Sequence, residues 1–364
     1  MRRLARRSAP LVAAALLLSA CSSTPATTPA SSVATSAASG GASVAPSDAI
    51  ADLRTKLNGQ KLKVGTSASA NPAITGAVHT VRYLKDTFGV DVELRQLDSD
   101  PLVAAVISSS VDVGQLSLAG TAAGKARGAD FLAFAGDDQP NPYYVVGRAP
   151  IKSLEEVRGQ AFGATENLSQ ITGQTATACL KSVGIDIKKD VKLLQLANTG
   201  AVAEALRSGQ IVAGLTAPHR MAPIIADEGA DKYNVLCVGK DVAPQQNNVW
   251  MAKRSWVDSH PDMALAFAIA SIDTGRWAHS DKEGWISLAL EAAPDYKRPA
   301  VEAIYATYVE QLDLWPINGS LDRSLCDATL KSSLDSGALD SPMKCDDVVR
   351  FDFQDKALDI LGKK

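Results

Sequence analysis

The sequence predicts an α/β protein with two lobes, each a mostly parallel β-sheet flanked by helices, joined by a two-strand hinge. Short β-rich runs alternate with helical stretches, which is the pattern of βαβ units around a parallel sheet. One series of such units starts near Lys61 and a second starts near Pro150. Roughly 315 residues follow a polar N-terminal region, which is more than one small domain needs.

The first series is predicted from strand-like runs that are each followed by a polar segment and a helical stretch. Gly89 is placed to end one helix, and Asp100 and Pro101 are placed as cap and first residue of the next. In chain order, we expect a strand at 61–66, a helix at 75–88, a strand at 90–97, a helix from 101, a strand at 111–116, a helix at 119–127 and a strand at 130–135.

The second series begins at Ser153-Leu154-Glu155-Glu156, a capping box that predicts a short helix. The last part of the chain is mainly helical, with Trp277, Trp285 and Trp315 expected in the core or between lobes. Between them we expect strands at 160–164, 191–196, 211–216 and 233–238 and helices from 172 to 183 and from 199 to 208. The chain is expected to cross between the lobes near 139–148 and 241–249.

The N-terminus reads as an export signal. Four arginines (Arg2, Arg3, Arg6 and Arg7) precede an apolar run at 10–18, which is too short to span a bilayer. The segment Leu18-Ser19-Ala20-Cys21 resembles the bacterial lipoprotein signal, in which the cysteine is lipidated after export. We therefore expect lipidation at Cys21 and an extracytoplasmic, lipid-anchored protein; the alternative is an ordinary secretory signal with an incidental cysteine.

Residues 22–48 are almost entirely Ser, Thr, Ala, Pro, Gly and Val and carry no charge before Asp48. Such a segment buries too little apolar surface to fold, and as a flexible coil it would reach roughly 30 Å. The predicted organisation is a signal peptide at 1–20, a lipidated cysteine and linker at 21–48, lobe 1 at 49–145 plus 245–364, and lobe 2 at 146–244.

The net charge of the chain bears on which class of partner it can bind. Without residues 1–20 the chain has 33 basic and 40 acidic residues, a net charge near −7, which argues against a nucleic-acid partner.

Besides Cys21 the cysteines are Cys179, Cys237, Cys326 and Cys345, an even number that favours two disulfides in an oxidising compartment. Three pairings are possible; Cys179–Cys237 and Cys326–Cys345 are favoured because each pair lies within one predicted unit. The scattered histidines and the absence of CxxC predict no metal site.

Several segments carry a family resemblance: KLKVGTSAS (61–69), GVDVELRQLDSDPLVAAVISSSVDVGQLS (89–117), SLEEVRGQAFG (153–163) and AEALRSGQIVAGLTAP (203–218). On these residues the chain resembles the type II periplasmic substrate-binding proteins of ABC transporters, above all the nitrate, sulfonate, taurine and thiamine-precursor binding group. The similarity covers most of 60–290. An internal repeat accompanies it, since AAVISSSVDVG (104–114) parallels EALRSGQIVAG (204–214), although Val212 stands where the first repeat has Asp112.

The resemblance implies a monomeric, non-enzymatic solute-binding lipoprotein without a cofactor, which delivers a small molecule to a permease and its ATPase. In an open parallel sheet, ligands bind beyond the carboxyl ends of the strands. The candidate ligand residues at these ends are Ser67, Ser69, Asn71, Ser117, Thr121, Gln139, Asn141, Ser169, Gln170, Thr172, Thr216, His219 and Asn247. Their hydroxyl and amide groups suit a polar or anionic solute, but the same residue types also favour helix caps.

Two other classes of function stay open from the sequence. An enzyme on the same fold would need acid–base groups, for which Asp137-Asp138 is the best pair, and the alternative for that pair is a solvated turn. A ligand-sensing lipoprotein without its own permease would have the same sequence features. The low aromatic content of 5% favours a small non-aromatic solute, of nitrate, sulfonate or taurine type, over a ring such as a thiamine precursor.

Overall fold

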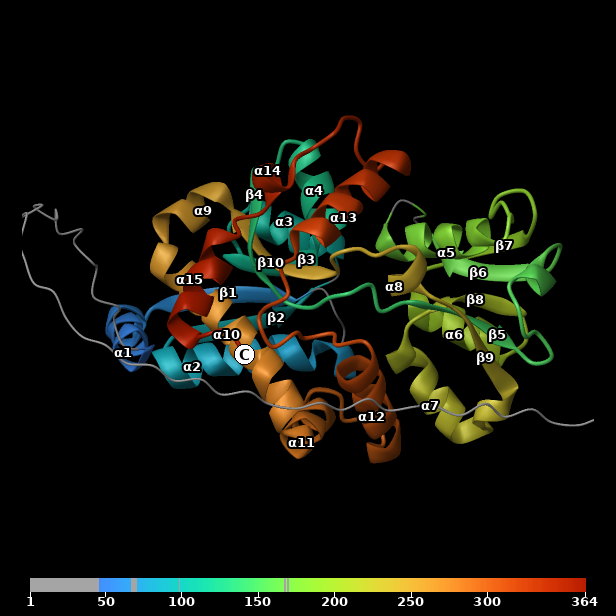
Figure 1. The fold of residues 1–364 in the computed structure, drawn as a ribbon, viewed down its shortest axis with the longest axis horizontal. Helices are drawn as coiled ribbons and strands as arrows, with labels where there is room; N and C mark the ends of the chain where they lie inside the picture. Colours follow the sequence, from blue (N-terminus) through green and yellow to red (C-terminus); the bar gives the residue numbers. More distant parts are fainter. Residues whose placement is uncertain (1–45, 67–70, 98, 167, 169) are drawn as a thin grey trace, which may run out of the picture. The chain divides into compact units, whose positions relative to one another are not determined.

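The computed structural model describes residues 46–66, 71–97, 99–166, 168 and 170–364 (Figure 1). Its first sheet has the strand order β2-β1-β3-β10-β4. Strands β1, β2 and β3 are parallel, whereas β10 is antiparallel to both β3 and β4. The strands are β1 (Lys61–Thr66), β2 (Asp91–Gln96), β3 (Val113–Ser117), β4 (Phe131–Gly136) and β10 (Asn248–Lys253).

The second sheet repeats this arrangement with the strand order β7-β6-β8-β5-β9. Here β6, β7 and β8 are parallel, and β5 is antiparallel to β8 and β9. The strands are β5 (Tyr144–Arg148), β6 (Ala161–Thr165), β7 (Lys192–Leu196), β8 (Ala213–Thr216) and β9 (Tyr233–Val238). In both sheets the antiparallel strand follows directly on a crossing from the other sheet, so that it enters against the direction of its neighbours.

Helices connect these strands, precede β1 and follow β10. They are α1 (Pro46–Leu57), α2 (Thr75–Phe88), α3 (Ser99–Ile107), α4 (Leu118–Ala126), α5 (Ile171–Ser182), α6 (Thr199–Arg207), α7 (Pro218–Glu228), α8 (Gly239–Val242), α9 (Arg254–Ser259), α10 (Pro261–Ser280), α11 (Lys282–Ala292), α12 (Arg298–Tyr305), α13 (Arg323–Asp335), α14 (Cys345–Val348) and α15 (Asp352–Leu361). Short 3₁₀ turns lie at η1 (Pro72–Ile74), η2 (Glu155–Val157) and η3 (Ala230–Lys232), and α12 continues into a π-helical turn, η4 (Ala306–Gln311).

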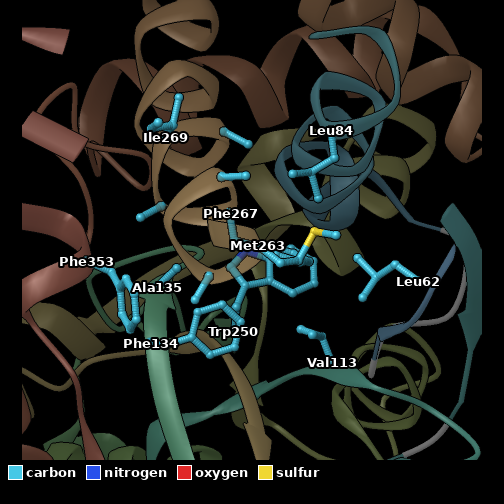
Figure 2. Close-up of a cluster of buried hydrophobic side chains, with 14 of the residues drawn as sticks. Leu62, Leu84, Val113, Phe134, Ala135, Trp250, Met263, Phe267, Ile269 and Phe353 are labelled. Carbon is cyan, nitrogen blue, oxygen red and sulfur yellow. The ribbon is translucent and has the colours of Figure 1, made fainter. Parts of the chain in front are cut away.

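The core of the first lobe lies on both faces of its sheet. On one face, α1, α2, α10 and α15 cover the sheet, and Trp250 of β10 packs on Phe267 of α10 with ring centroids 5.2 Å apart (Figure 2). Phe134 of β4 meets the edge of Phe267 at 5.6 Å. On the other face, α3, α4, α13 and α14 supply the buried side chains. The sheet is therefore covered by helices on both sides, as the alternation of elements predicts.

The second sheet is likewise sandwiched, with α5 packed on one face and α6 and α7 on the other. A separate helical cluster joins α11, α12 and η4 around Trp285 and Trp315, both almost fully buried. Trp277 stacks on His79 of α2 at 3.9 Å. The tryptophans predicted as packing residues are thus confirmed in that role.

The internal repeat of the sequence corresponds to equivalent positions in the two sheets. The Asp112 carboxylate, just before β3, accepts a hydrogen bond from the Lys63 N–H at 2.8 Å. Its counterpart Val212 lies just before β8. The Val212 N–H donates a hydrogen bond to the Ala161 carbonyl at 3.0 Å, and its side chain packs against the core of the second sheet. The backbone pairing therefore survives without the aspartate, which explains how the repeat tolerates valine there.

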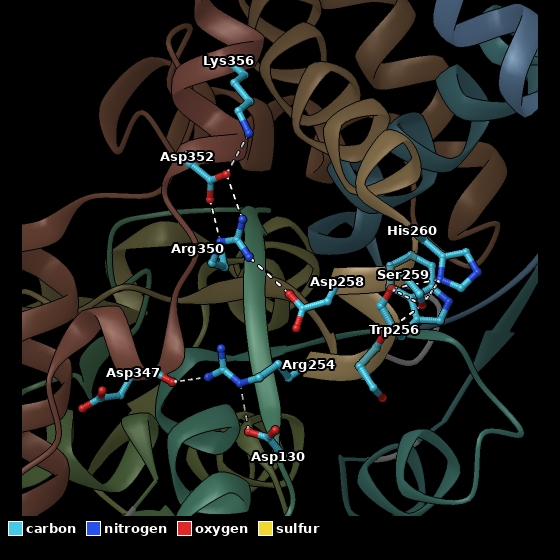
Figure 3. A network of polar contacts seen from close by, with 11 residues as sticks. Asp130, Arg254, Trp256, Asp258, Ser259, His260, Asp347, Arg350, Asp352 and Lys356 are labelled. Atoms are coloured by element: carbon cyan, nitrogen blue, oxygen red, sulfur yellow. Dashed lines mark hydrogen bonds and ion pairs between the residues drawn. The ribbon is translucent and has the colours of Figure 1, made fainter.

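Polar contacts fasten the C-terminal helices to the first lobe (Figure 3). Arg350 makes a bidentate ion pair with Asp352, with N···O distances of 2.7 and 2.9 Å, and contacts Asp258 of α9 at 3.4 Å. Arg254 bridges Asp130, before β4, and the Asp347 carbonyl of α14. The hydrogen bonds from Arg350 lower the pKa of Asp352 to about 2, so the bidentate pair stays charged at neutral pH.

Two disulfides are present, and they pair as the sequence favours: Cys179–Cys237 joins α5 to β9, and Cys326–Cys345 joins α13 to α14. Two predicted helix starts are wrong. Helix α3 begins at Ser99, so that Asp100 lies in its first turn rather than at the cap. The segment from Glu155 forms only a 3₁₀ turn whose preceding residue, Leu154, makes no side-chain cap.

Among the described residues, no helix is both long and apolar enough to cross a membrane. The signal peptide, Cys21 and nearly all of the linker lie outside the described residues, so their assignment stays a prediction. The same holds for the lobe boundaries, although the first sheet takes its strands from 61–136 and 248–253 and the second from 144–238.

Candidate ligand-binding site

A cavity of about 280 Å³ lies at the carboxyl ends of the parallel strands of both sheets. Its wall contains the N-cap or first residue of six helices, from α2 to α7. These residues are Ile74, Ser99, Ser117, Gln170, Asn198 and Ala217. They follow β1, β2 and β3 in the first sheet and β6, β7 and β8 in the second, which is where ligands bind in open α/β sheets.

Small polar side chains organise these helix starts. Ser117 accepts a hydrogen bond from the Gly120 N–H at 3.1 Å, and Asn198 accepts one from the Ala201 N–H at 3.0 Å. Asn71 caps the turn η1 in the same way, through the Ala73 N–H at 2.8 Å. The first turns of helices carry backbone N–H groups that no intrahelical carbonyl accepts, together with the positive end of the helix dipole. These residues therefore cap helices and line the cavity at once.

Arg220 of α7 brings a cationic side chain to this wall and is hydrogen-bonded to Tyr296. A guanidinium and several helix N-termini around one small cavity give it a positive electrostatic character. An anion placed there meets charge-assisted hydrogen bonds, which are about twice as strong as neutral ones.

Asp138 is the acidic residue of the cavity wall and belongs to a buried pair with Asp137. Its carboxylate accepts hydrogen bonds from the backbone N–H and the side-chain amide of Asn248, at 2.8 and 3.0 Å. Asp137 accepts one from the Gln115 amide. Burial raises the pKa of Asp138 to about 6, and burial together with the charge of Asp138 raises the pKa of Asp137 well above its usual value.

His219 and Tyr308 close another part of the wall. The His219 Nδ1 lies 2.6 Å from the Tyr308 hydroxyl, so α7 of the second lobe is bonded to the π-helical turn η4. Burial, reinforced by the charge of Arg220, lowers the pKa of His219 to about 3. The histidine is therefore neutral at physiological pH and acts as a hydrogen-bonding group rather than a cation.

Of the residues expected from the sequence to contact a ligand, six line the cavity: Asn71, Ser117, Gln170, Thr172, His219 and Asn247. Ser67, Ser69 and Ser169 lie outside the described residues, so they stay predictions.

Four expected residues do not line this cavity, and the side-chain polar groups of three of them bond within the fold. Thr121 donates its hydroxyl to the Ser117 carbonyl at 3.0 Å, and Thr216 donates to the Thr199 carbonyl at 2.9 Å. Asn141 donates to the Thr175 hydroxyl and to the Ala243 carbonyl, which ties the two crossings together. The backbone N–H of Gln139 donates a hydrogen bond to the Leu314 carbonyl at 2.8 Å, which holds this residue against the helical region of the first lobe.

Other wall residues escaped the sequence analysis. Asn198 and Thr199 follow β7, so the rule that selected residues after strands applies to them as well. Gln115 lies within β3, and Tyr308 comes from the C-terminal helical region. Neither position carries a signal in the sequence, since both depend on how distant segments pack.

Comparison with known families decides the identity. Residues 67–276 match the family model of the phosphonate ABC transporter periplasmic substrate-binding protein. The chain belongs to this family. A comparison with curated proteins gave no match.

Solved structures of substrate-binding proteins share the fold. The aliphatic sulphonate binding protein of Escherichia coli is 15% identical, with a TM-score of 0.63 over 80% of this chain and 92% of its own. The alkanesulfonate-binding protein of Xanthomonas axonopodis pv. citri bound to MOPS is 16% identical, with a TM-score of 0.63 over 80% and 99%. The nitrate-binding protein of Synechocystis PCC 6803 is 12% identical, with a TM-score of 0.66 over 84% and 89%.

Membership in the family confirms the role in an ABC importer that the sequence predicts. This substrate-binding protein is the solute-capturing component of an ABC importer, and its cavity between the strand ends is the candidate solute site.

Proposed function

We propose that this substrate-binding protein captures a small polar or anionic solute of nitrate, sulfonate or taurine type between its lobes, lobe 1 at 49–145 plus 245–364 and lobe 2 at 146–244. The observation that carries the proposal is the convergence of six helix N-termini and Arg220 on one cavity. That arrangement supplies hydrogen-bond donors from both lobes to a single ligand. A thiamine-precursor ring is less well supported, because the polar wall residues outnumber the aromatic ones.

Binding is coupled to lobe closure in this proposal. A ligand favours the closed state only if it contacts both lobes, and the cavity wall offers Ser117 and Asn247 from one lobe and Gln170 and Asn198 from the other. The closed protein then delivers the solute to a permease and its ATPase as a monomer that is not an enzyme.

A lipid on Cys21 would keep the protein at the outer side of the cell membrane. The basic N-terminus, the short apolar run and Leu18-Ser19-Ala20-Cys21 support this anchoring. Replacing Cys21 by alanine is expected to release the exported protein from the membrane fraction, and mass spectrometry of the wild-type N-terminus is expected to find the acyl chains. Wild-type protein that fractionates without membranes would contradict the anchor.

The enzyme alternative would depend on Asp137 and Asp138. Their carboxyl groups accept hydrogen bonds from Gln115 and Asn248, which favours a structural role beside the hinge over acid–base work. Recovery of each bound compound unchanged after incubation, judged by mass spectrometry, is the outcome expected of a binding protein. A sensing lipoprotein is distinguished by the genes beside its own, which would lack a permease and ATPase pair.

The decisive experiment measures ligand affinity in a chain that begins after Cys21. A thermal-shift screen of oxyanions, sulfonates, phosphonates, amino acids and pyrimidines selects a compound class, and calorimetry gives its Kd. Arg220→Met is expected to weaken binding of an anion about 10- to 100-fold, because a charged hydrogen bond contributes about 1.5–3 kcal/mol. Arg207→Met, which removes a surface partner of Glu204, is the matched control. Unchanged affinity in Arg220→Met would contradict the anionic solute.

A further inference from the structure

A separate, apolar cavity of about 440 Å³ lies between helix α7 of the second lobe and helix α12 of the first. Strands β5 and β9 and the turn η4 complete its wall. The two helices leave room between them because both carry alanines at the wall, namely Ala222 and Ala226 on α7 and Ala300 and Ala303 on α12. A molecule in this cavity therefore contacts helices that belong to different lobes.

The charge of the wall selects the class of molecule that fits. None of the described residues that line this cavity is charged, whereas Arg220 and Asp138 line the solute cavity. A charged group bound here would lose its hydration without meeting an opposite charge. The volume of about 440 Å³ lies within the range of small-molecule pockets, about 300–1,000 Å³. The cavity therefore suits a small uncharged molecule with an apolar body.

Hydrogen bonds within the fold use much of the polarity that the wall has. The Tyr233 hydroxyl donates to the Glu228 carboxylate at 2.9 Å, and the Asn234 side chain donates to the Ile151 carbonyl at 2.8 Å. The hydroxyl of Tyr144, by contrast, makes no hydrogen bond within the described part of the chain. This hydroxyl can donate to a ligand and accept from it, so one hydrogen-bonding group on the apolar molecule finds a partner.

The apolar cavity and the solute cavity adjoin the same contact between the lobes. His219 and Tyr308 line the solute cavity, and their neighbours in sequence, Pro218 and Thr307, line the apolar cavity. No described wall residue is common to the two cavities. A molecule held between α7 and α12 favours the lobe arrangement in which the contact between His219 and Tyr308 is made and the solute cavity is formed. By linkage, each ligand then strengthens the binding of the other.

We propose that the apolar cavity is a second ligand site, for a small uncharged molecule with an apolar body and one hydrogen-bonding group, whose binding strengthens capture of the solute. The body lies between the alanines of α7 and α12, and the polar group meets the Tyr144 hydroxyl. The site uses neither the charges nor the residues of the solute cavity, so it does not depend on the anionic solute proposed above.

The first test compares an uncharged and a charged probe with the same ring system. The probes are 1-naphthol, an aromatic alcohol, and 1-naphthylmethylammonium, which carries a positive charge. In fluorescence titrations, wild-type protein is expected to bind one naphthol per chain with a Kd of about 100 μM or lower, and the ammonium compound at least tenfold more weakly. Equal binding of the two probes, or no saturable binding of naphthol, would overturn the proposal.

Variants that fill the cavity locate the bound naphthol. Ala222→Phe on α7 and Ala303→Phe on α12 each place a ring in the cavity and are expected to weaken naphthol binding at least tenfold. Ala230→Phe adds the same ring at an exposed position just after α7, outside the wall, and is expected to leave the Kd unchanged. Thermal melting verifies folding, and if one filling variant does not fold, the other decides. Unchanged affinity in a folded filling variant would contradict binding at this site.

Coupling to the lobes is tested with Tyr308→Phe, which removes the hydrogen bond to His219 at a residue outside the apolar wall. This variant is expected to bind naphthol about three- to fivefold more weakly, because the lobes are then less firmly held together. Tyr305→Phe, whose hydroxyl donates to Ala278 within the helical cluster, is the matched control and is expected to bind as wild type. Equal naphthol affinity in Tyr308→Phe and wild type would contradict the coupling.

The same coupling is measured from the solute side with the tightest compound of the thermal-shift screen. Saturating naphthol is expected to lower the Kd of that compound severalfold in wild-type protein and to leave it unchanged in Ala222→Phe. An unchanged Kd in wild-type protein would overturn the coupling, whereas the anionic solute would stand.

A second copy of the chain is the alternative occupant, because the wall includes the exposed side chain of Val235. Sedimentation distinguishes the two: wild-type protein is expected to be monomeric with and without naphthol. A wild-type dimer that Ala222→Phe converts to a monomer would show that protein covers the cavity, and would overturn the small-molecule site.

Discussion

The Nδ1 of His219 and the hydroxyl of Tyr308 lie 2.6 Å apart and bond the second lobe to the helical region of the first, at the wall of the solute cavity. Both side chains are buried, and their rings meet edge to face with centroids 6.1 Å apart. Burial keeps the histidine neutral, with a pKa of about 3, and raises the pKa of the tyrosine well above 10. The contact therefore joins two neutral groups and does not change its charge between pH 5 and 8.

Removing this hydroxyl is expected to weaken solute binding without unfolding the protein. Tyr308→Phe deletes one hydrogen bond between the lobes, which contributes about 1 kcal/mol, so the Kd is expected to rise about fivefold. Tyr305→Phe is the matched control, because that hydroxyl donates to the Ala278 carbonyl within the helical cluster and its loss should not change affinity. Equal affinities of Tyr308→Phe and wild type, measured by calorimetry, would contradict a role of the contact in closure.

Acid is expected to strengthen binding of an anion through Asp138. This carboxyl lines the cavity with a pKa of about 6, so its negative charge, which repels an anionic ligand, disappears as the pH falls through 6. The Kd of a sulfonate, whose own charge is constant in this range, should fall severalfold between pH 8 and pH 5. In Asp138→Asn, the Kd is expected to be independent of pH. The surface variant Glu291→Gln is expected to keep the pH dependence of wild-type protein. A Kd of wild-type protein that does not change with pH would show that the charge of Asp138 does not affect binding of the anion.

Asp137 is expected to make the protein less stable as the pH rises. Its pKa is raised in the folded state, mainly by burial, so the folded protein keeps a proton that the unfolded chain releases above about pH 4. The stability that this proton provides is present at low pH and is lost as the pH rises through the folded-state pKa. Between the unfolded-state pKa of about 4 and the raised folded-state pKa, the free energy of unfolding falls by about 1.4 kcal/mol for each pH unit.

Asp137→Asn removes this titration and keeps an oxygen that can accept the Gln115 hydrogen bond. Its free energy of unfolding relative to wild type is expected to increase from pH 5 to pH 8 in urea titrations. Asp227→Asn, which removes a surface partner of Lys297, serves as the control with a constant difference. The slope of the difference with pH is the diagnostic quantity, since a neutral amide has its own pH-independent effect on packing. Parallel curves for Asp137→Asn and wild type would overturn the assignment.

The fold was largely predictable because its signals are local. Gly89 ends α2 with a positive φ of 69°, and the 61–66 run forms β1 with the predicted bounds. The repeat around Asp112 and Val212 lies at equivalent positions of two sheets with matching strand arrangements. Residues after parallel strands were found by topology alone, which is why Ser117 and Gln170 line the cavity as expected.

The part of the site that the sequence does not predict depends on packing between distant segments. Tyr308 lines the cavity from the π-helical turn that continues α12, and nothing in the local pattern marks that turn. Asn141 and Thr216 have the right residue types after strands, but nearby donors and acceptors such as Thr175 and the Thr199 carbonyl engage them. Composition selects polar side chains, and only the three-dimensional arrangement shows which of them serve the fold.

The two disulfides are expected to contribute unequally to stability. Cys179 and Cys237 are 58 residues apart in sequence, whereas Cys326 and Cys345 are 19 apart. Constraint of the unfolded chain grows with the loop that is closed, which gives about 4 kcal/mol for the first bridge and about 3 kcal/mol for the second. Paired Cys→Ala variants at each bridge, compared by urea unfolding, should show the larger loss for Cys179–Cys237. Because this bridge lies within the second lobe, between α5 and β9, its loss is expected to lower the unfolding free energy without changing the Kd of the folded protein. A larger loss at Cys326–Cys345 would mean that packing around α13 and α14 outweighs loop entropy.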